Sequence, residues 1–155
     1  MVLWKRSLDS YISIHPPSCT GFLPVVYNPP GCPVSIHIAL YLPTSGKESE
    51  FLDQLIQLSN CITDLRDKFD DECLIFLRGD ANVNHNHKER MKIFSNFLLI
   101  HKLILIPIKH KTYHHFLGGG AFDSNIDIIG HSEDSPHKEM VTDILCKKCH
   151  PDIQS

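Results

Sequence analysis

The 155 residues include 15 Lys and Arg against 18 Asp and Glu, which gives a formal net charge of -3, and 42% of them are hydrophobic. This apolar content is enough for one core, so we expect a single domain over residues 1–155, or part of one, and exclude a natively disordered chain. The charge provides no basic footprint for nucleic acid. The longest apolar run, Phe97–Ile108, is interrupted by His101, Lys102 and Pro107, which favours neither a signal peptide nor a membrane span.

The first third of the chain reads as short strands. Residues 2–6, 11–14 and 22–27 are predicted strands, separated by proline and glycine. Residues 34–41 alternate, with Ile36, Ile38 and Leu40 on an apolar face and Tyr41 on the more polar face. This alternation predicts a strand with one face in the core.

A long helix is expected next. Ser45 and Glu48 have the spacing of a capping box, and apolar residues then recur at helical spacing at Phe51, Leu55, Leu58, Ile62, Leu65 and Phe69. Residues 73–77 are five apolar residues in a row, which indicates a strand buried on both faces. A strand, a helix and a strand in this order favour parallel pairing, which would bring Tyr41 and Asp80 to the same edge of one sheet.

The remaining elements complete an α+β pattern. A second helix is expected from Asn86, with Glu89 in its capping box and a buried stripe at Met91, Phe94 and Leu98. Further strands are predicted at residues 103–106, 112–116, 125–129 and 141–146, with a turn at residues 118–120. Many short strands with two helices favour a sandwich of two sheets with outer helices.

Polar residues follow the buried strand directly. Gly79 lets the backbone bend, and Asp80 and Asn82, two residues apart, can project the same way. A carboxylate there can accept a proton from water or bind a hard cation, and an amide supplies a donor and an acceptor whose charge is independent of pH. The alternative is an Asx-rich turn that leaves a strand. Further along, Asp127 and Asn125 alternate with apolar isoleucines, which favours a polar role for both.

Three motifs in chain order carry a family resemblance. They are a strand that ends in Tyr41-Leu42-Pro43, the Gly79-Asp80-Ala81-Asn82 segment, and Ser124-Asn125-Ile126-Asp127. In this order they resemble the endonuclease/exonuclease/phosphatase superfamily, and most of all the apurinic-type endonuclease domain of non-LTR, LINE-like retrotransposons. The resemblance runs from about Trp4 to the end of the chain. It implies an incomplete four-layer α/β/β/α sandwich.

The resemblance also implies roles for individual residues. Asp80 would orient and deprotonate the attacking water, and Asn82 would hold the water or a phosphate oxygen. From its position, Tyr41 would donate a hydrogen bond to a phosphate oxygen or, as a phenolate, stabilise charge that develops in the transition state. The alternative for Tyr41 is an aromatic side chain that packs at the rim of the sheet. Asp127 would pair with a histidine and fix the tautomer of its ring. Mg²⁺ or Mn²⁺ would be the cofactor of the complete domain, with Asp80 and Asn82 as ligands. Residues on the substrate side would be Tyr113, His115 and Asn125.

The sequence also departs from the family pattern. The metal-binding Glu of the family precedes the segment that residues 1–6 resemble, and the catalytic His follows about where residues 151–155 end. We therefore expect the middle and later part of a DNA endonuclease domain, which in a complete protein would precede a reverse transcriptase in the same polyprotein and act in the nucleus. Two alternatives stay open: a remnant without turnover that serves as an interaction module, and a phosphatase acting on a lipid or inositol headgroup.

One cysteine motif lies apart from these segments. Cys146-Lys147-Lys148-Cys149-His150 has the spacing of c-type haem attachment, which requires export, and zinc would require a second pair of Cys or His ligands. The six cysteines have no framework spacing, which favours free thiols in a reducing, intracellular compartment. We therefore expect an edge strand that binds neither haem nor stoichiometric zinc.

Overall fold

The computed structural model describes residues 4–15, 21–70, 72–83, 87–106, 113–117, 120–124 and 127–133, and in 113–127 it describes the backbone alone. A 3-10 helix over Arg6–Tyr11 comes first. The strands that follow are β1 (Ile12–Ile14), β2 (Phe22–Tyr27), β3 (Ser35–Tyr41), β4 (Leu74–Asp80), β5 (Leu103–Leu105), β6 (Tyr113–Leu117), β7 (Gly120–Ser124) and β8 (Asp127–Ser132). The helices are α1 (Glu48–Phe69), between β3 and β4, and α2 (Lys88–Ile100), between β4 and β5.

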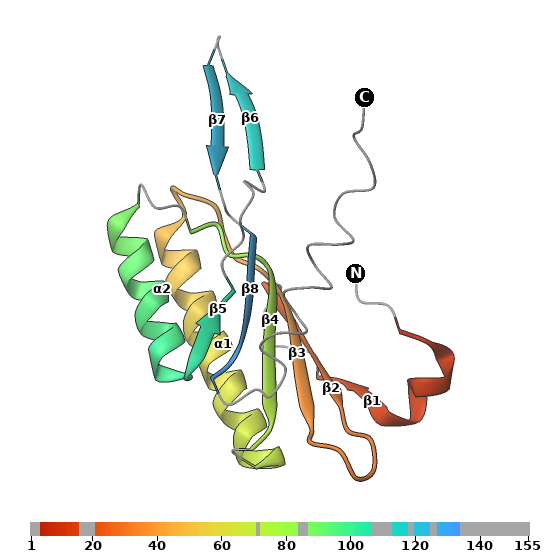
Figure 1. The fold of residues 1–155 in the computed structure, drawn as a ribbon. Helices are drawn as coiled ribbons and strands as arrows, with labels where there is room; N and C mark the ends of the chain where they lie inside the picture. The colour runs from red at the N-terminus through yellow and green to blue at the C-terminus, as the bar shows by residue number, and fades with distance from the viewer. Residues whose placement is uncertain are drawn as a thin grey trace, which may run out of the picture.

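Six strands form one mixed sheet in the order β1-β2-β3-β4-β8-β5. The predicted parallel pair is present, because β3 and β4 run parallel with α1 as their connection, whereas the other neighbours pair antiparallel. Strands β6 and β7 pair with each other in a separate hairpin. This hairpin extends beyond the end of the sheet at which β3 and β4 finish (Figure 1).

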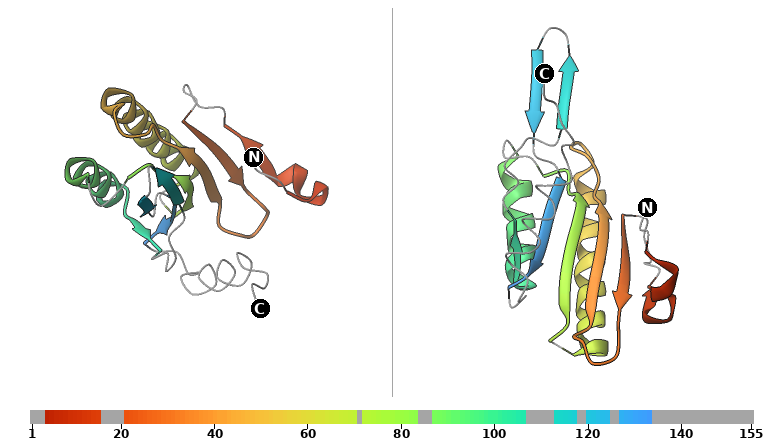
Figure 2. Two further views of the ribbon diagram at one scale, coloured as in Figure 1. Left: turned by 90° about the horizontal axis from the view of Figure 1, so that it is seen from above. Right: turned by 45° about the vertical axis from the view of Figure 1, so that its right-hand side comes forward.

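Both helices cover the same face of the sheet (Figure 2). The helical repeat of apolar residues in α1 buries Phe51, Leu58 and Ile62 completely. Every second residue of the two parallel strands meets them from the sheet, as Ile36 and Ile75 do at neighbouring positions in the register. Burial of a side chain of this size contributes about 1.5–3 kcal/mol, so this helix-on-sheet layer is a large source of stability for the part of the chain that the structure describes.

The fold class predicted from sequence is confirmed as α+β, and the described residues supply one helix layer and one large sheet of the predicted sandwich. The details at the helix starts differ. The N-cap of α2 is His87, and Asn86, which was expected to begin the second capping box, lies outside the described residues. The box predicted at Ser45 and Glu48 does not form, because the N-cap of α1 is Lys47, which makes no capping bond through its side chain. Instead Glu48 Oε1 accepts a bond from the backbone N–H of Gly46 at 3.3 Å.

Some of the predicted elements differ from the structure or lie outside its described residues. The strand expected over residues 2–6 is wrong in its described part, where residues 4 and 5 are irregular and a 3-10 helix begins at Arg6. Strand β7 was not predicted, because its glycine-rich start reads as part of a turn. The strand expected at 141–146 and the cysteine motif at 146–150 lie outside the described residues. In the part of the chain that the structure describes, no helix is long and apolar enough to cross a membrane.

His37 of β3 lies on the sheet face opposite the helices. Its ring stacks on Phe76 of β4 with centroids 4.9 Å apart, and its Nε2 lies 3.1 Å from Ser35 Oγ. Burial, assisted by the positive charge of Arg78, lowers the pKa of His37 to about 4. His37 therefore stays neutral in the folded state at pH values at which the same residue is already protonated in the unfolded chain.

We predict that this difference makes stability depend on pH. Between about pH 6.5 and pH 4 the unfolded chain binds more protons at this residue, so the free energy of unfolding falls as the pH falls through that window, by roughly 2 kcal/mol. Above the window His37 contributes no pH dependence. Denaturant unfolding of the wild type and of His37→Gln at both ends of the window measures the effect. Parallel losses of stability in the two proteins would show that His37 is not responsible.

Candidate active site

Three residues singled out from sequence meet at one edge of the sheet. Tyr41 at the end of β3 is the register partner of Asp80 at the end of β4. On the other side of β4, Asp80 is the register partner of Asp127, the first residue of β8. The sheet therefore brings together residues that are far apart in sequence, as the parallel crossover predicted for the first two.

Gly79 makes this strand end possible. Its φ of +137° lies in a region that side chains with a Cβ rarely adopt, and a Cβ there would overlap the carbonyl oxygen of Leu40 on β3. The close approach continues one residue further, where the backbone N–H of Leu42 donates to the carbonyl oxygen of Asp80 at 2.9 Å. The two strand exits are thus held together by their main chains.

Asn82 fixes the Asp80 carboxylate. Its backbone N–H donates to Asp80 Oδ1 at 2.8 Å, and its φ is +49°. Its Nδ2 donates to the carbonyl oxygen of Leu42 at 2.8 Å. The bond to Asp80 is that of an Asx turn, so the turn considered as an alternative from sequence does form. Here the turn also holds a carboxylate in one orientation at the end of a rigid strand.

The candidate residues differ in access to solvent. Tyr41 is 62% exposed at the rim of the sheet, so the phenol is accessible to a ligand. Asp80 and Asn82 are half-buried. A half-buried carboxylate beside an exposed phenol can act on a group that approaches from solvent.

The residues predicted on the substrate side do not belong to the strand ends that carry Tyr41 and Asp80. Tyr113 and His115 belong to β6, in the hairpin beyond the sheet (Figure 1), and their register partners are Ser124 and Phe122 of β7. They are therefore not part of the row formed by Tyr41, Asp80 and Asp127. Asn125 lies outside the described residues.

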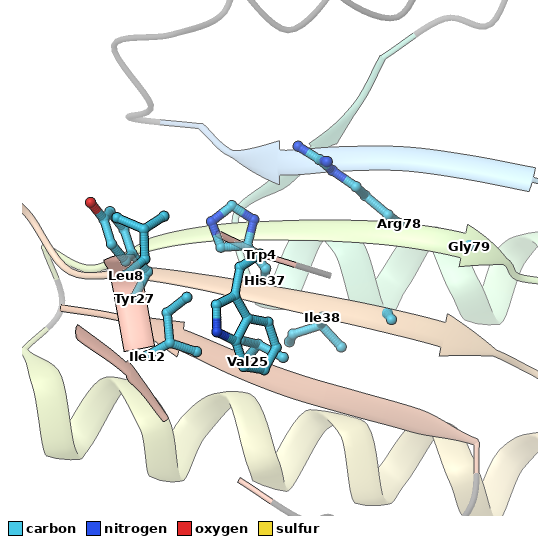
Figure 3. A pocket seen from close by; sticks show the side chains of 10 residues that line it. Trp4, Leu8, Ile12, Val25, Tyr27, His37, Ile38, Arg78 and Gly79 are labelled. Carbon is cyan, nitrogen blue, oxygen red and sulfur yellow. The ribbon is translucent and has the colours of Figure 1, made fainter. Parts of the chain in front are cut away.

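A groove of about 670 Å³ runs along the face of the sheet opposite the helices to the start of this edge (Figure 3). It is mostly apolar, and its basic groups are His37 and Arg78. Arg78 was missed in the sequence. Its signal is its position two residues before Asp80 on the same strand, which puts an arginine on the face that carries the candidate carboxylate. The groove is lined by Trp4, Leu8, Ile12, Val25, Tyr27, His37, Ile38, Ala39, Arg78 and Gly79.

The side chains at this edge carry carboxylate and amide oxygens, which are the ligand type that a hard cation prefers. Among the described residues no three His, Cys, Asp or Glu side chains gather into a metal-binding cluster. Magnesium does not need such a cluster, because proteins commonly bind it through one or two carboxylates together with water and substrate phosphates. Asp80, the amide oxygen of Asn82 and the register partner Asp127 are oxygen donors of this type.

We compared the chain with known families, curated proteins and solved structures. No family model and no curated protein matches the chain. Among solved structures, the endonuclease domain of TRAS1, a telomere-specific non-LTR retrotransposon, matches with a TM-score of 0.68 and 16% identity over 85% of this chain and 59% of that chain. More distant matches are TDP2 of D. rerio complexed with single-strand DNA product (TM-score 0.49, 10% identity, 82% and 56% coverage) and TDP2 from C. elegans (0.48, 11%, 79% and 41%).

The chain thus spans a little over half the length of the TRAS1 domain that it matches. At this identity the match establishes the fold, which confirms the architecture implied by the three sequence motifs. The chain has the fold of the TRAS1 endonuclease domain, as expected from the resemblance of its motifs to the endonuclease/exonuclease/phosphatase superfamily.

Proposed function

We propose that this chain is part of a metal-dependent phosphodiesterase domain that cuts DNA in the manner of a retrotransposon endonuclease. The observation that carries the proposal is the row of register partners Tyr41, Asp80 and Asp127 at one edge of the sheet. A row with a phenol and two carboxylates supplies part of the set of groups that hydrolysis of a phosphodiester uses. The similarity of the fold to the TRAS1 endonuclease domain supports DNA as the substrate.

The proposal assigns tasks to individual residues. Asp80, held by the Asn82 N–H at 2.8 Å, orients the attacking water and takes its proton. Asn82 places that carboxylate, and Tyr41 donates a hydrogen bond to a phosphate oxygen as charge develops. Asp127 orients a histidine supplied from outside this chain. A bound Mg²⁺ would neutralise charge on the phosphate, with Asp80 and Asn82 as its ligands in this chain.

Arg78 gives this face of the sheet a cation for the DNA backbone. It is exposed, lies two residues before Asp80 and lines the groove. An arginine suits a phosphate because its planar fork can donate two bonds to the same group. The remaining basic residues are dispersed, so we propose that other parts of a complete protein supply most of the affinity for DNA and that a reverse transcriptase accompanies the domain in the nucleus.

The test compares the chain with a completed domain, meaning the chain extended at both ends by the endonuclease segments that flank the matched region in relatives of this fold. We expect the completed domain to nick supercoiled plasmid in the presence of Mg²⁺. We expect Asp80→Ala to reduce this activity by at least about a thousandfold, because the step that activates water is lost. The chain by itself should nick no faster than a heat-killed control.

Circular dichroism of each protein provides the control for folding. A folded completed domain without activity would favour the alternative, a remnant that serves as an interaction module. Hydrolysis of an inositol phosphate in preference to DNA would favour the phosphatase reading instead. Nicking by the chain alone that Asp80→Ala abolishes would show that the chain already contains a sufficient set of catalytic groups.

A further inference from the structure

Arg90, the third residue of α2, is the most deeply buried charged side chain that the structure describes, with 3% of its surface exposed. Arginine is almost never fully buried unless its charge and its donors are paired. Sequence reasoning assigned it no role, although Arg90, Phe94 and Phe97 recur at helical spacing and are all buried. A buried arginine on that stripe requires an explanation beyond packing of the helix.

Each of the three nitrogens of the guanidinium group donates at least one hydrogen bond. Nη1 donates to the carbonyl oxygens of Pro43 and Asn82, each at 2.9 Å. Nη2 donates to the carbonyl oxygen of Thr44 at 3.1 Å, and Nε donates to Glu48 Oε2 at 3.0 Å. The Cζ atom of Arg90 lies over the ring of Phe51, 4.1 Å from its centroid.

The three carbonyl partners of Arg90 belong to the two loops that leave the candidate site. Pro43 and Thr44 follow Tyr41 on the exit from β3, and Asn82 follows Asp80 on the exit from β4. A single nitrogen of Arg90 therefore bridges the two loops at their carbonyl groups. Asn82 is held at three points, since its carbonyl oxygen accepts from Arg90 while its N–H and its amide donate to Asp80 and Leu42.

We propose that Arg90 is a positioning residue for the candidate site: it locks the left-handed backbone of Asn82 and so aims the Asp80 carboxylate toward the edge shared with Tyr41. The proposal rests on the proposed function for its catalytic meaning, but the geometry it describes can be tested without turnover. Lysine cannot replace Arg90, because one ammonium group on a flexible stem cannot match a planar fork that reaches three carbonyl oxygens and a carboxylate.

A role in stability alone makes a different prediction. Loss of Arg90 would then weaken the whole domain, and every protected amide would exchange faster by a similar factor. If Arg90 positions Asn82, the change is local, because the carbonyl oxygen of Asn82 loses its charged donor while strands β3 and β4 keep their ladder. The backbone N–H of Asn82 donates to Asp80 Oδ1, so its hydrogen exchange reports directly on this local change.

The experiment measures amide hydrogen exchange by NMR in the chain itself, for the wild type, Arg90→Lys and Glu48→Gln. Glu48→Gln is the matched control, because it removes the ion pair at 3.0 Å but keeps the three bonds from Arg90 to carbonyl oxygens. We expect exchange at Asn82 to be at least about tenfold faster in Arg90→Lys, the size expected when a buried acceptor loses its donor. The core amides of Ile38 and Leu77 should change by less than about threefold.

Addition of millimolar methylguanidinium to Arg90→Ala provides a second measurement should Arg90→Lys be poorly folded. Slower exchange at Asn82 on addition would support the proposal, and no change would count against it. Exchange at Asn82 that matches Glu48→Gln, or that rises in step with the core amides, would overturn the positioning role. Because these readouts involve no DNA cleavage, failure of the proposed nuclease function would appear separately, in the plasmid assay.

Discussion

Gly79→Ala is expected to destabilise the chain by at least about 3 kcal/mol, because the substitution combines a strained φ with overlap between the new Cβ and a main-chain atom. The φ of Gly79 is +137°, and the atom in the way is the carbonyl oxygen of Leu40 in the neighbouring parallel strand. A backbone atom inside a paired strand cannot move aside as the end of a flexible side chain can. Denaturant unfolding followed by circular dichroism measures the loss.

Gly31→Ala is the matched control for this substitution. Gly31 also has a positive φ, +73°, but a Cβ there meets nothing within 4 Å. It should therefore show only the cost of the backbone conformation, about 1–2 kcal/mol. If Gly79→Ala is no more destabilising than Gly31→Ala, the close approach of the two strand ends is wrong, and with it the frame that places Asp80 beside Tyr41.

The second large effect concerns Asp127 and depends on which protein is measured. In the completed domain we predict that Asp127→Asn lowers turnover by at least about a hundredfold, because the histidine that acts in proton transfer would lose the carboxylate that fixes its tautomer. In the chain alone the same change should alter the free energy of unfolding by no more than about 1 kcal/mol. Steady-state cleavage rates and denaturant midpoints give the two values.

This pair of measurements distinguishes a catalytic carboxylate from a structural one. A structural Asp127 would show the reverse pattern, with a large loss of stability in the chain and turnover in the completed domain reduced only as far as folding is reduced. Wild-type turnover in the completed Asp127→Asn protein would mean that Asp127 is only the first residue of β8 and that the catalytic centre is misplaced.

The sequence was sufficient to place Tyr41 beside Asp80. This placement follows from the alternation in residues 34–41, the helical repeat that became α1 and the apolar run of β4, because a strand, helix and strand in succession favour a parallel pair. The register shows these two residues directly opposite one another. The pairing of Asp80 with Asp127 could not be predicted in this way, because no local sequence pattern specifies that β8 pairs antiparallel with β4.

Other features were beyond the sequence for identifiable reasons. The turn at Asn82 was one of two alternatives in the sequence, and its φ of +49° could not be predicted, because an Asn adopts such a φ readily without requiring it. Arg90 lies among charged neighbours at the start of α2, so its burial is visible only once Pro43, Thr44 and Asn82 surround it. The capping box at the start of α1 failed because the side chain of Glu48 bonds to Arg90 and to the backbone N–H of Gly46.

The central claim is that Tyr41 and Asp127, on either side of Asp80, serve one reaction. A double-mutant cycle on turnover of the completed domain tests it most directly, with Tyr41→Phe, Asp127→Asn and the two combined. Residues that act as a unit are strongly non-additive, so we predict that the double variant is slower than the worse single variant by less than about threefold. Losses that multiply in full would contradict a shared site at this edge of the sheet.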